Sequence, residues 1–153
     1  MSDRSPDNRP QEIRIGAHLF RWEPPDVGYV CYHGDLEGES MFALSEQSRH
    51  YTLGRPHLFL LVDMAHVGKV STEARQVLAQ GGRDLNMRGI AVIGATGPMR
   101  IISSLVSRAV DLLNGNRDNP TRFFESESEA RRWIGERRAA QTLATRRFVP
   151  SPS

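Results

Sequence analysis

Hydroxyl and acidic side chains gather in one stretch of the chain where they could carry a phosphate-controlled contact. The apolar run Leu58 to Val62 ends at Asp63, and Ser71 and Thr72 follow. Serine is a common helix N-cap, and a phosphate at a helix N-terminus adds roughly −1.5 to −2 charge beside free backbone amides. Ser71 and Thr72 are therefore candidate phosphorylation sites. The alternative is that Ser71 is an unmodified cap.

The residues before this pair predict an exposed contact loop from Met64 to Val70. It contains the only lysine of the chain, whose compact ammonium could pair with a partner carboxylate. We expect a protein partner to bind this loop and the start of the following helix. The candidate contact residues are Asp63, His66, Gly68, Lys69, Glu73 and Arg75.

A second candidate site is the turn Gly94-Ala-Thr-Gly97, where backbone amides could hold an anion. Its members would be Gly94, Thr96, Gly97 and Arg100. Arg100 stands where a dinucleotide-binding loop needs a third glycine, and the Lys-Ser/Thr pair of a P-loop is missing. The motif is weak, and a tight turn from a strand into a helix is the alternative.

Other reactive residue types give no catalytic or metal-binding pattern. The five histidines (18, 33, 50, 57 and 66) lack metal-ligand spacing, and the single cysteine, Cys31, lies in a strand-like segment. One cysteine also excludes an internal disulfide. We find no assembled acid-base pair, nucleophile or cofactor loop, and therefore expect a non-enzymatic protein without cofactor or metal.

Composition is that of one globular domain. The chain has 153 residues, 39% hydrophobic and 25% charged, and a net charge of +2. Its longest apolar stretch has five residues, far below the ~20 that span a membrane, and its first residues are too polar for a signal peptide. These features predict a cytoplasmic protein.

Apolar periodicity predicts an α/β fold in the order β-β-α-β-α-β-α-β-α. Residues 1–11 are expected to be a disordered arm, 12–140 the folded domain and 141–153 a basic, flexible tail. Runs 58–62 and 89–93 are apolar throughout, which indicates adjacent inner strands covered on both faces. The predicted strands are 18–22, 29–33, 58–62, 89–93 and 121–124, with a further short strand at 13–15. The predicted helices are 37–51, 71–81, 98–113 and one that begins with a capping box at 126–129.

This order, with a strand ending in Asp before a helix that starts at Ser, resembles the STAS domain of sulfate transporters and anti-sigma-factor antagonists. The family hallmark is roughly D-x-S-x-x-x-x-x-D-S-S-G. Here Asp63 matches its first position, Ala65 stands at the next serine, and Ser71, Thr72 and Glu73 follow at the second motif, unless a loop shorter by one residue aligns Ser71-Thr72 with the serine pair. The half from Arg88 to Trp133 is similar to stand-alone bacterial STAS-like proteins, some grouped with CRAL-TRIO lipid-transfer domains. The resemblance covers about 12–137.

The resemblance implies a regulatory protein-interaction module. In such antagonists a partner kinase, itself an anti-sigma factor, phosphorylates the serine at this helix start, and the negative charge breaks the complex. A first alternative is a carrier in which the sheet and helix 98–113 enclose a small apolar ligand or a nucleotide. A second is nucleic-acid binding by the C-terminal segment 131–147, which has six arginines and one acid. A solvated helix end would explain the same arginines.

Overall fold

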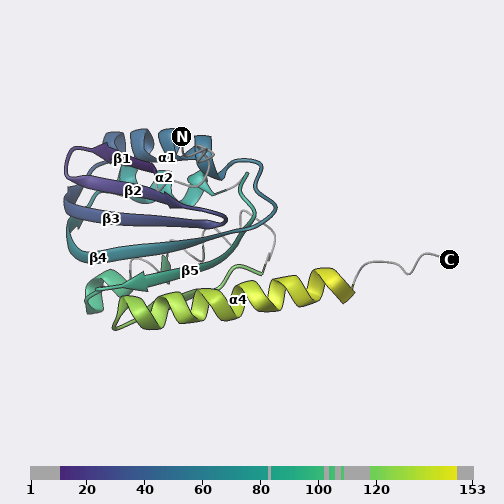
Figure 1. Cartoon of the computed structure of the whole chain (residues 1–153). Coiled ribbons are helices and arrows are strands. Elements are labelled where there is room, and N and C mark those ends of the chain that lie inside the picture. Colours follow the sequence, from purple (N-terminus) through teal and green to yellow (C-terminus); the bar gives the residue numbers. More distant parts are fainter. Residues whose placement is uncertain (1–10, 83, 102–103, 106–107, 109–117, 148–153) are drawn as a thin grey trace, which may run out of the picture.

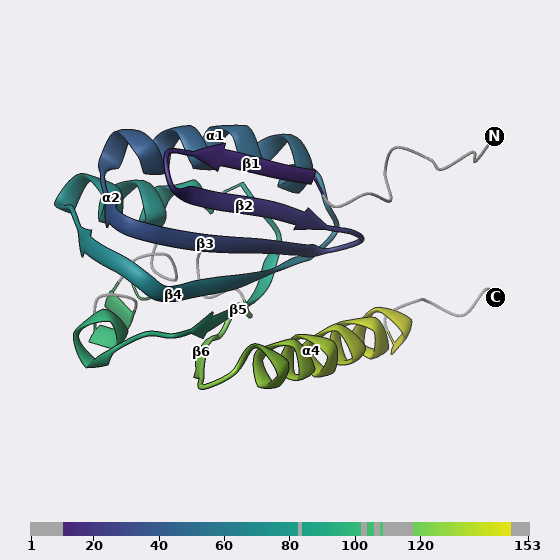
Figure 2. The ribbon, with the colours of Figure 1, turned by 60° about the vertical axis from the view of Figure 1, so that its left-hand side comes forward.

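The computed structural model describes residues 11–82, 84–101, 104, 105, 108 and 118–147. In these residues six strands form one sheet in the order β1-β2-β3-β4-β5-β6 (Figure 1; β6 is labelled in Figure 2). The strands are β1 (Gln11–Ile15), β2 (His18–Glu23), β3 (Val27–Leu36), β4 (Leu58–Val70), β5 (Met87–Ile93) and β6 (Thr121–Phe124). Three helices are described over their whole length: α1 (Gly38–Thr52), α2 (Thr72–Gly81) and α4 (Glu127–Arg147). Residues 97–101, 104, 105 and 108 are also helical.

The sheet is antiparallel at its start and parallel at its end. β1, β2 and β3 pair as an antiparallel meander, whereas β3 to β6 pair in parallel. Gly16 has a φ of +58° in the two-residue turn between β1 and β2, a conformation that glycine adopts without strain. Parallel neighbours need a crossover, and α1 and α2 supply the first two. Both helices lie together in Figure 2, apart from α4.

Two apolar cores cover the two faces of the sheet. The core under α1 and α2 contains Phe20, Trp22, Val30, Tyr32, Leu36, Met41, Leu44, Val62, Met64, Val70, Ala74 and Val92. The core under α4 contains Val27, Tyr29, Phe59, Leu61, Ala91, Ile93, Ala130, Trp133 and Ile134. Successive residues of β4 therefore point into different cores, which explains why its first half has no polar alternation.

The predicted adjacency of the two inner strands is confirmed. Phe59 pairs with Gly89 and Leu61 with Ala91 in a parallel ladder. A Cβ added at Gly89 would lie 3.2 Å from Trp133 Cη2, so this glycine makes room for the large ring that α4 places on the sheet. The capping box at the start of α4 has its serine half: Ser126 Oγ accepts from the Glu129 amide at 3.3 Å.

Arginines of the C-terminal segment hold α4 on the sheet. Arg131 Nη1 lies 2.7 Å from Glu23 Oε1, and Arg137 Nη2 donates to the carbonyl of Arg88 at 2.7 Å. Arg138 donates to both carboxylate oxygens of Asp26 at 2.8 and 2.6 Å. Half of the six arginines that suggested a nucleic-acid surface are thus engaged within the domain, which disfavours that alternative.

The structure differs from the expected elements at several boundaries. β1 is a regular strand that begins at Gln11, a residue of the expected disordered arm 1–11. α4 continues to Arg147, so residues 141–147 extend a helix where a tail was expected. β4 runs through Val70, where the contact loop was expected. Much of the predicted helix 98–113, residues 1–10 and residues 148–153 lie outside the described residues.

Candidate functional site

Residues 64–70 form a strand, which corrects the expected loop. β3 is long enough to pair with them: His33 pairs with His66, Gly34 with Val67 and Leu36 with Val70. Two register shifts interrupt this ladder, and they hide its period from the sequence. Met64 and Val70 are both 8% exposed. The burial of these side chains and the partner strand together make the segment a strand.

Gly68 and Lys69 are positioned by Asp35 on the neighbouring strand. The Lys69 amide donates to Asp35 Oδ1 at 2.8 Å. A Cβ at Gly68 would lie 2.3 Å from the same oxygen, so the close crossing of β3 and β4 requires glycine there. Packing against Asp35 therefore accounts for the glycine at position 68. The position of Lys69 is exposed, which leaves its side chain open to a partner.

Asp63 lies at a different place from the α2 N-terminus. Val70 follows Asp63 by seven positions, and strand geometry makes that roughly 20 Å. Asp63 Oδ1 accepts from the Ala65 amide at 2.9 Å, and Tyr29 donates to Oδ2 at 3.4 Å. Asp63 and Ser71 therefore do not form one compact contact loop.

Two titratable side chains, Tyr29 and Cys31, lie near Asp63. Burial and the Asp63 charge raise the pKa of Tyr29 to about 12. Burial, followed by the same charge, raises the pKa of the Cys31 thiol. A thiol with a raised pKa is less often the nucleophilic thiolate at neutral pH. The Cys31 side chain is half-buried and is thus more exposed than the core residues.

His66 is brought beside His33, with the ring centroids 5.3 Å apart. Both are exposed. Across the described residues, no three His, Cys, Asp or Glu side chains are arranged to hold a metal ion.

Ser71 and Thr72 differ sharply in what their hydroxyls do. Ser71 Oγ accepts from the Ala74 amide at 3.0 Å and caps α2, and the Ser71 amide donates to the carbonyl of Leu36 at 3.0 Å. Thr72 is exposed, and Arg75 Nη2 lies 3.5 Å from its Oγ1. Arg75 Nε is buried, and among the described residues it has no hydrogen-bond partner. Thr72 is consequently the more accessible hydroxyl.

Glu73 belongs to a cleft between the N-termini of α1 and α2. The cleft has a volume of about 490 Å³ and is lined by Glu37, Gly38, Glu39, Glu73, Gln76, Val77 and Gln80. A Cβ at Gly38 would lie 2.6 Å from Glu73 Cβ, so glycine permits the two helix starts to meet. Glu37 and Glu39 were not among the contact residues expected from the sequence. Their position at the start of the helix predicted for 37–51 was the available signal, because acids favour helix N-termini.

The glycine turn after β5 is explained by packing. Gly94 has a φ of +72°, and a Cβ there would lie 2.6 Å from the Ala65 amide nitrogen. The Arg100 amide donates to the carbonyl of Thr96 at 2.9 Å, closing a helical turn that includes Gly97. The Arg100 guanidinium lies 5.5 Å from the centroid of the Phe123 ring.

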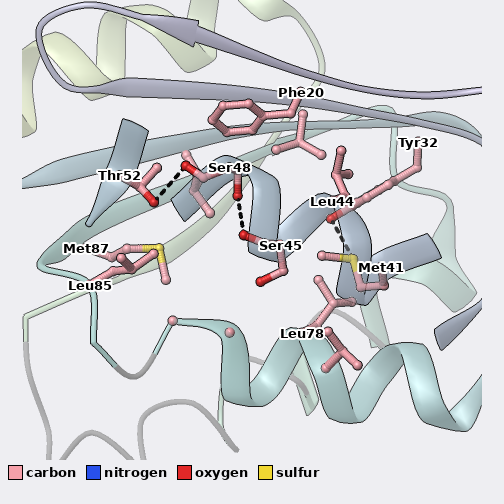
Figure 3. Close-up of a pocket in the computed structure, with 15 residues that line it drawn as sticks. Phe20, Tyr32, Met41, Leu44, Ser45, Ser48, Thr52, Leu78, Leu85 and Met87 are labelled. Carbon is pink, nitrogen blue, oxygen red and sulfur yellow. Dashed lines mark hydrogen bonds between the residues drawn. The ribbon is translucent and has the colours of Figure 1, made fainter. Parts of the chain in front are cut away.

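An apolar cavity of about 90 Å³ lies between α1, α2 and the sheet (Figure 3). Phe20, Leu44, Leu78 and Met87 are among its lining residues. Its polar groups bond to one another or to backbone: Tyr32 donates to Met41 Sδ, Ser48 to the carbonyl of Ser45, and Thr52 to that of Ser48. The carrier alternative expected an enclosed space at helix 98–113, and this cavity lies elsewhere.

Comparison with solved structures found chains of similar fold. The chain is similar to the crystal structure of an uncharacterized protein from the DUF3478 family with a SpoIIAA-like fold from Shewanella loihica PV-4. The match has 16% identity and a TM-score of 0.47, and it covers 88% of this chain and 98% of the other. No protein-family model and no curated protein matches the chain. In the residues described, no helix combines the length and the hydropathy of a membrane span.

Proposed function

We propose that this protein is a non-enzymatic regulatory module of the cytoplasm that binds a partner protein where α1 and α2 begin. The cleft between these helix starts carries the proposal. It places three glutamates, Glu37, Glu39 and Glu73, around one recess, and within the described residues none of them is in an ion pair. Free carboxylates in a recess suit a lysine or arginine side chain of a partner.

The apolar cavity that the described residues enclose under α1 and α2 is small for a carrier site. Small-molecule sites are commonly about 300–1,000 Å³ in volume. The cavity under α1 and α2 has about 90 Å³, too little for a lipid or a nucleotide. The cleft is the larger recess and faces solvent at an edge where two helices present side chains.

Thr72 is the modification site that fits this surface. Ser71 is engaged as the cap of α2, whereas Thr72 is exposed beside the guanidinium of Arg75. A phosphate on Thr72 would be attracted by the helix N-terminus and by Arg75. A phosphate held there would cover Thr72 by its bulk and would weaken the binding of a partner that packs on this residue. The STAS resemblance implies an anti-sigma factor of the serine-kinase type as the partner.

The test is photo-crosslinking from inside the cleft. A photoreactive amino acid replaces Gln76, which lines the cleft, or Glu136 on the exposed side of α4 as the matched control. We expect one discrete cross-linked protein from position 76 and none of it from position 136. Glu73→Lys should abolish that product by reversing a cleft charge. Equal products from both positions, or a product that Glu73→Lys leaves unchanged, would contradict the proposal.

The switch is tested in the same assay. Phosphothreonine incorporated at position 72 should lower the yield of the cross-linked protein, because its bulk covers the contact, and Thr72→Ala should preserve the yield. Thermal melts of both variants should match the wild-type chain, because Thr72 is exposed and does not cap the helix. An unchanged yield with phosphothreonine at position 72 would remove Thr72 from the switch while leaving the binding surface in place.

A further inference from the structure

We infer that β1 is a self-association edge, through which two copies of this chain pair β1 against β1 and join their sheets. β1 stands at one end of the strand order, and within the described residues its strand neighbour is β2. Figure 2 shows it along the outer margin of the sheet. Such an edge presents backbone donors and acceptors to another strand.

The hairpin geometry determines which residues face outward. Ile15 and His18 flank the two-residue turn between β1 and β2. A pair in that position exchanges both backbone hydrogen bonds, and bonded and non-bonded pairs alternate along an antiparallel ladder. The backbone N–H and C=O groups of Ile13 therefore point toward β2. Those of Glu12 and Arg14 point away from the sheet.

The charges of these two outward residues select one register. With the two-fold axis beside Ile13, Glu12 of each copy lies opposite Arg14 of the other, and both are bonded positions of the new ladder. An axis beside Glu12 or beside Arg14 would place like charges directly opposite each other, which destabilises a strand pair. A shift by one residue would oppose an outward position to an inward one. The edge is thus complementary to itself in a single register, as a two-fold interface requires.

The side chains on both faces suit this pairing. Arg14 and Glu12 have side-chain exposures of 69% and 43% and lie 3.5 Å apart, so in a pair of strands they would form a network of four charges. Ile13 is half-buried on the opposite face against the core under α1. It would meet the same residue of the second copy in a non-bonded pair, where side chains approach most closely. Both faces of the joined strands would therefore gain contacts.

Charge exchange tests the register with the full-length chain. We expect the wild-type chain to form dimers in sedimentation equilibrium. Glu12→Arg and Arg14→Glu should each raise the dimer dissociation constant ~10-fold or more, because each turns two attractive pairs into repulsive ones. An equimolar mixture of these two variants again has opposite charges in both pairs and should associate about as well as the wild type. Arg132→Glu, an exposed reversal on α4, should leave association unchanged.

The outcomes that overturn the inference are specific. A wild-type chain that stays monomeric up to its solubility limit rules out the edge pairing. Dimers that survive both single reversals, or a mixture that fails to restore them, place the interface elsewhere. Circular dichroism and thermal melts confirm that each variant is folded, which the exposure of both side chains leads us to expect.

Discussion

Arg138 donates two hydrogen bonds to the carboxylate of Asp26, from Nε at 2.8 Å and from Nη2 at 2.6 Å. The Asp26 side chain is 3% exposed, and His57 Nε2 also lies 3.3 Å from it. The pair links the turn before β3 to the middle of α4, across 112 residues of sequence. It is a bidentate contact at a buried carboxylate, the arrangement in which ion pairs are strongest.

Removal of Arg138 should destabilise the domain. Arg138→Leu leaves the buried Asp26 carboxylate with a weaker partner, and we expect a loss of about 2–3 kcal/mol in the free energy of unfolding. That is below the ~3–5 kcal/mol typical of a fully buried pair, because Arg138 is 40% exposed. Urea unfolding at neutral pH measures the loss. Arg132→Leu on the exposed side of α4 should change the free energy of unfolding by less than about 0.5 kcal/mol.

Glu23 should make stability fall at acidic pH. The hydrogen bond from Arg131 lowers the pKa of Glu23 below its ordinary value of 4.5. A lowered folded-state pKa contributes stability that is fully present above pH 4.5 and is lost as the pH falls through the folded value. Chemical unfolding should show that Glu23→Gln has a lower free energy of unfolding than the wild-type chain at pH 7. This difference should shrink as the pH is lowered to 3.

Arg131→Gln is the companion variant for Glu23. It removes the largest cause of the lowered pKa, so its own disadvantage should shrink over the same acidic range. A disadvantage of Glu23→Gln that stays constant from pH 7 to pH 3 would show that ionisation of Glu23 does not contribute to folding.

Gly94 should be far less tolerant of alanine than Gly97. At Gly94 a side chain meets both a positive φ and the backbone of Ala65, and we expect Gly94→Ala to cost about 2–4 kcal/mol. At Gly97 an added Cβ meets nothing within 4 Å, so Gly97→Ala should be neutral or slightly stabilising. Thermal and urea unfolding of the two variants make the comparison. Equal losses at both positions would argue against packing as the reason for the first glycine.

Asp63 should restrain the reactivity of Cys31. The Asp63 charge contributes to the raised pKa of the thiol, and it is the second cause after burial. Asp63→Asn keeps an oxygen for the Ala65 amide while removing the charge, so iodoacetamide should alkylate Cys31 several-fold faster at pH 8. Asp35→Asn is the charge-matched control and should leave the rate unchanged. A rate that stays the same with Asp63→Asn would assign the slow reaction to burial alone.

The local sequence pattern alone was sufficient to predict those elements that depend on the residue types within them. The apolar runs at 58–62 and 89–93 had to be inner strands, because a segment without polar residues is stable in a sheet only when both faces are covered. Ser71 likewise caps α2 through a bond to an amide three residues away. Such contacts span one turn, and the residue types in that turn are sufficient to predict them.

Tertiary structure decided what depends on distant partners. Residues 64–70 became a strand because β3 pairs with them across two register shifts, which no local period records. The cleft exists because Gly38 lets the start of α1 approach Glu73, a residue 35 positions later in the chain. The free energy of both features resides in contacts between segments far apart in sequence, so only the folded chain establishes them.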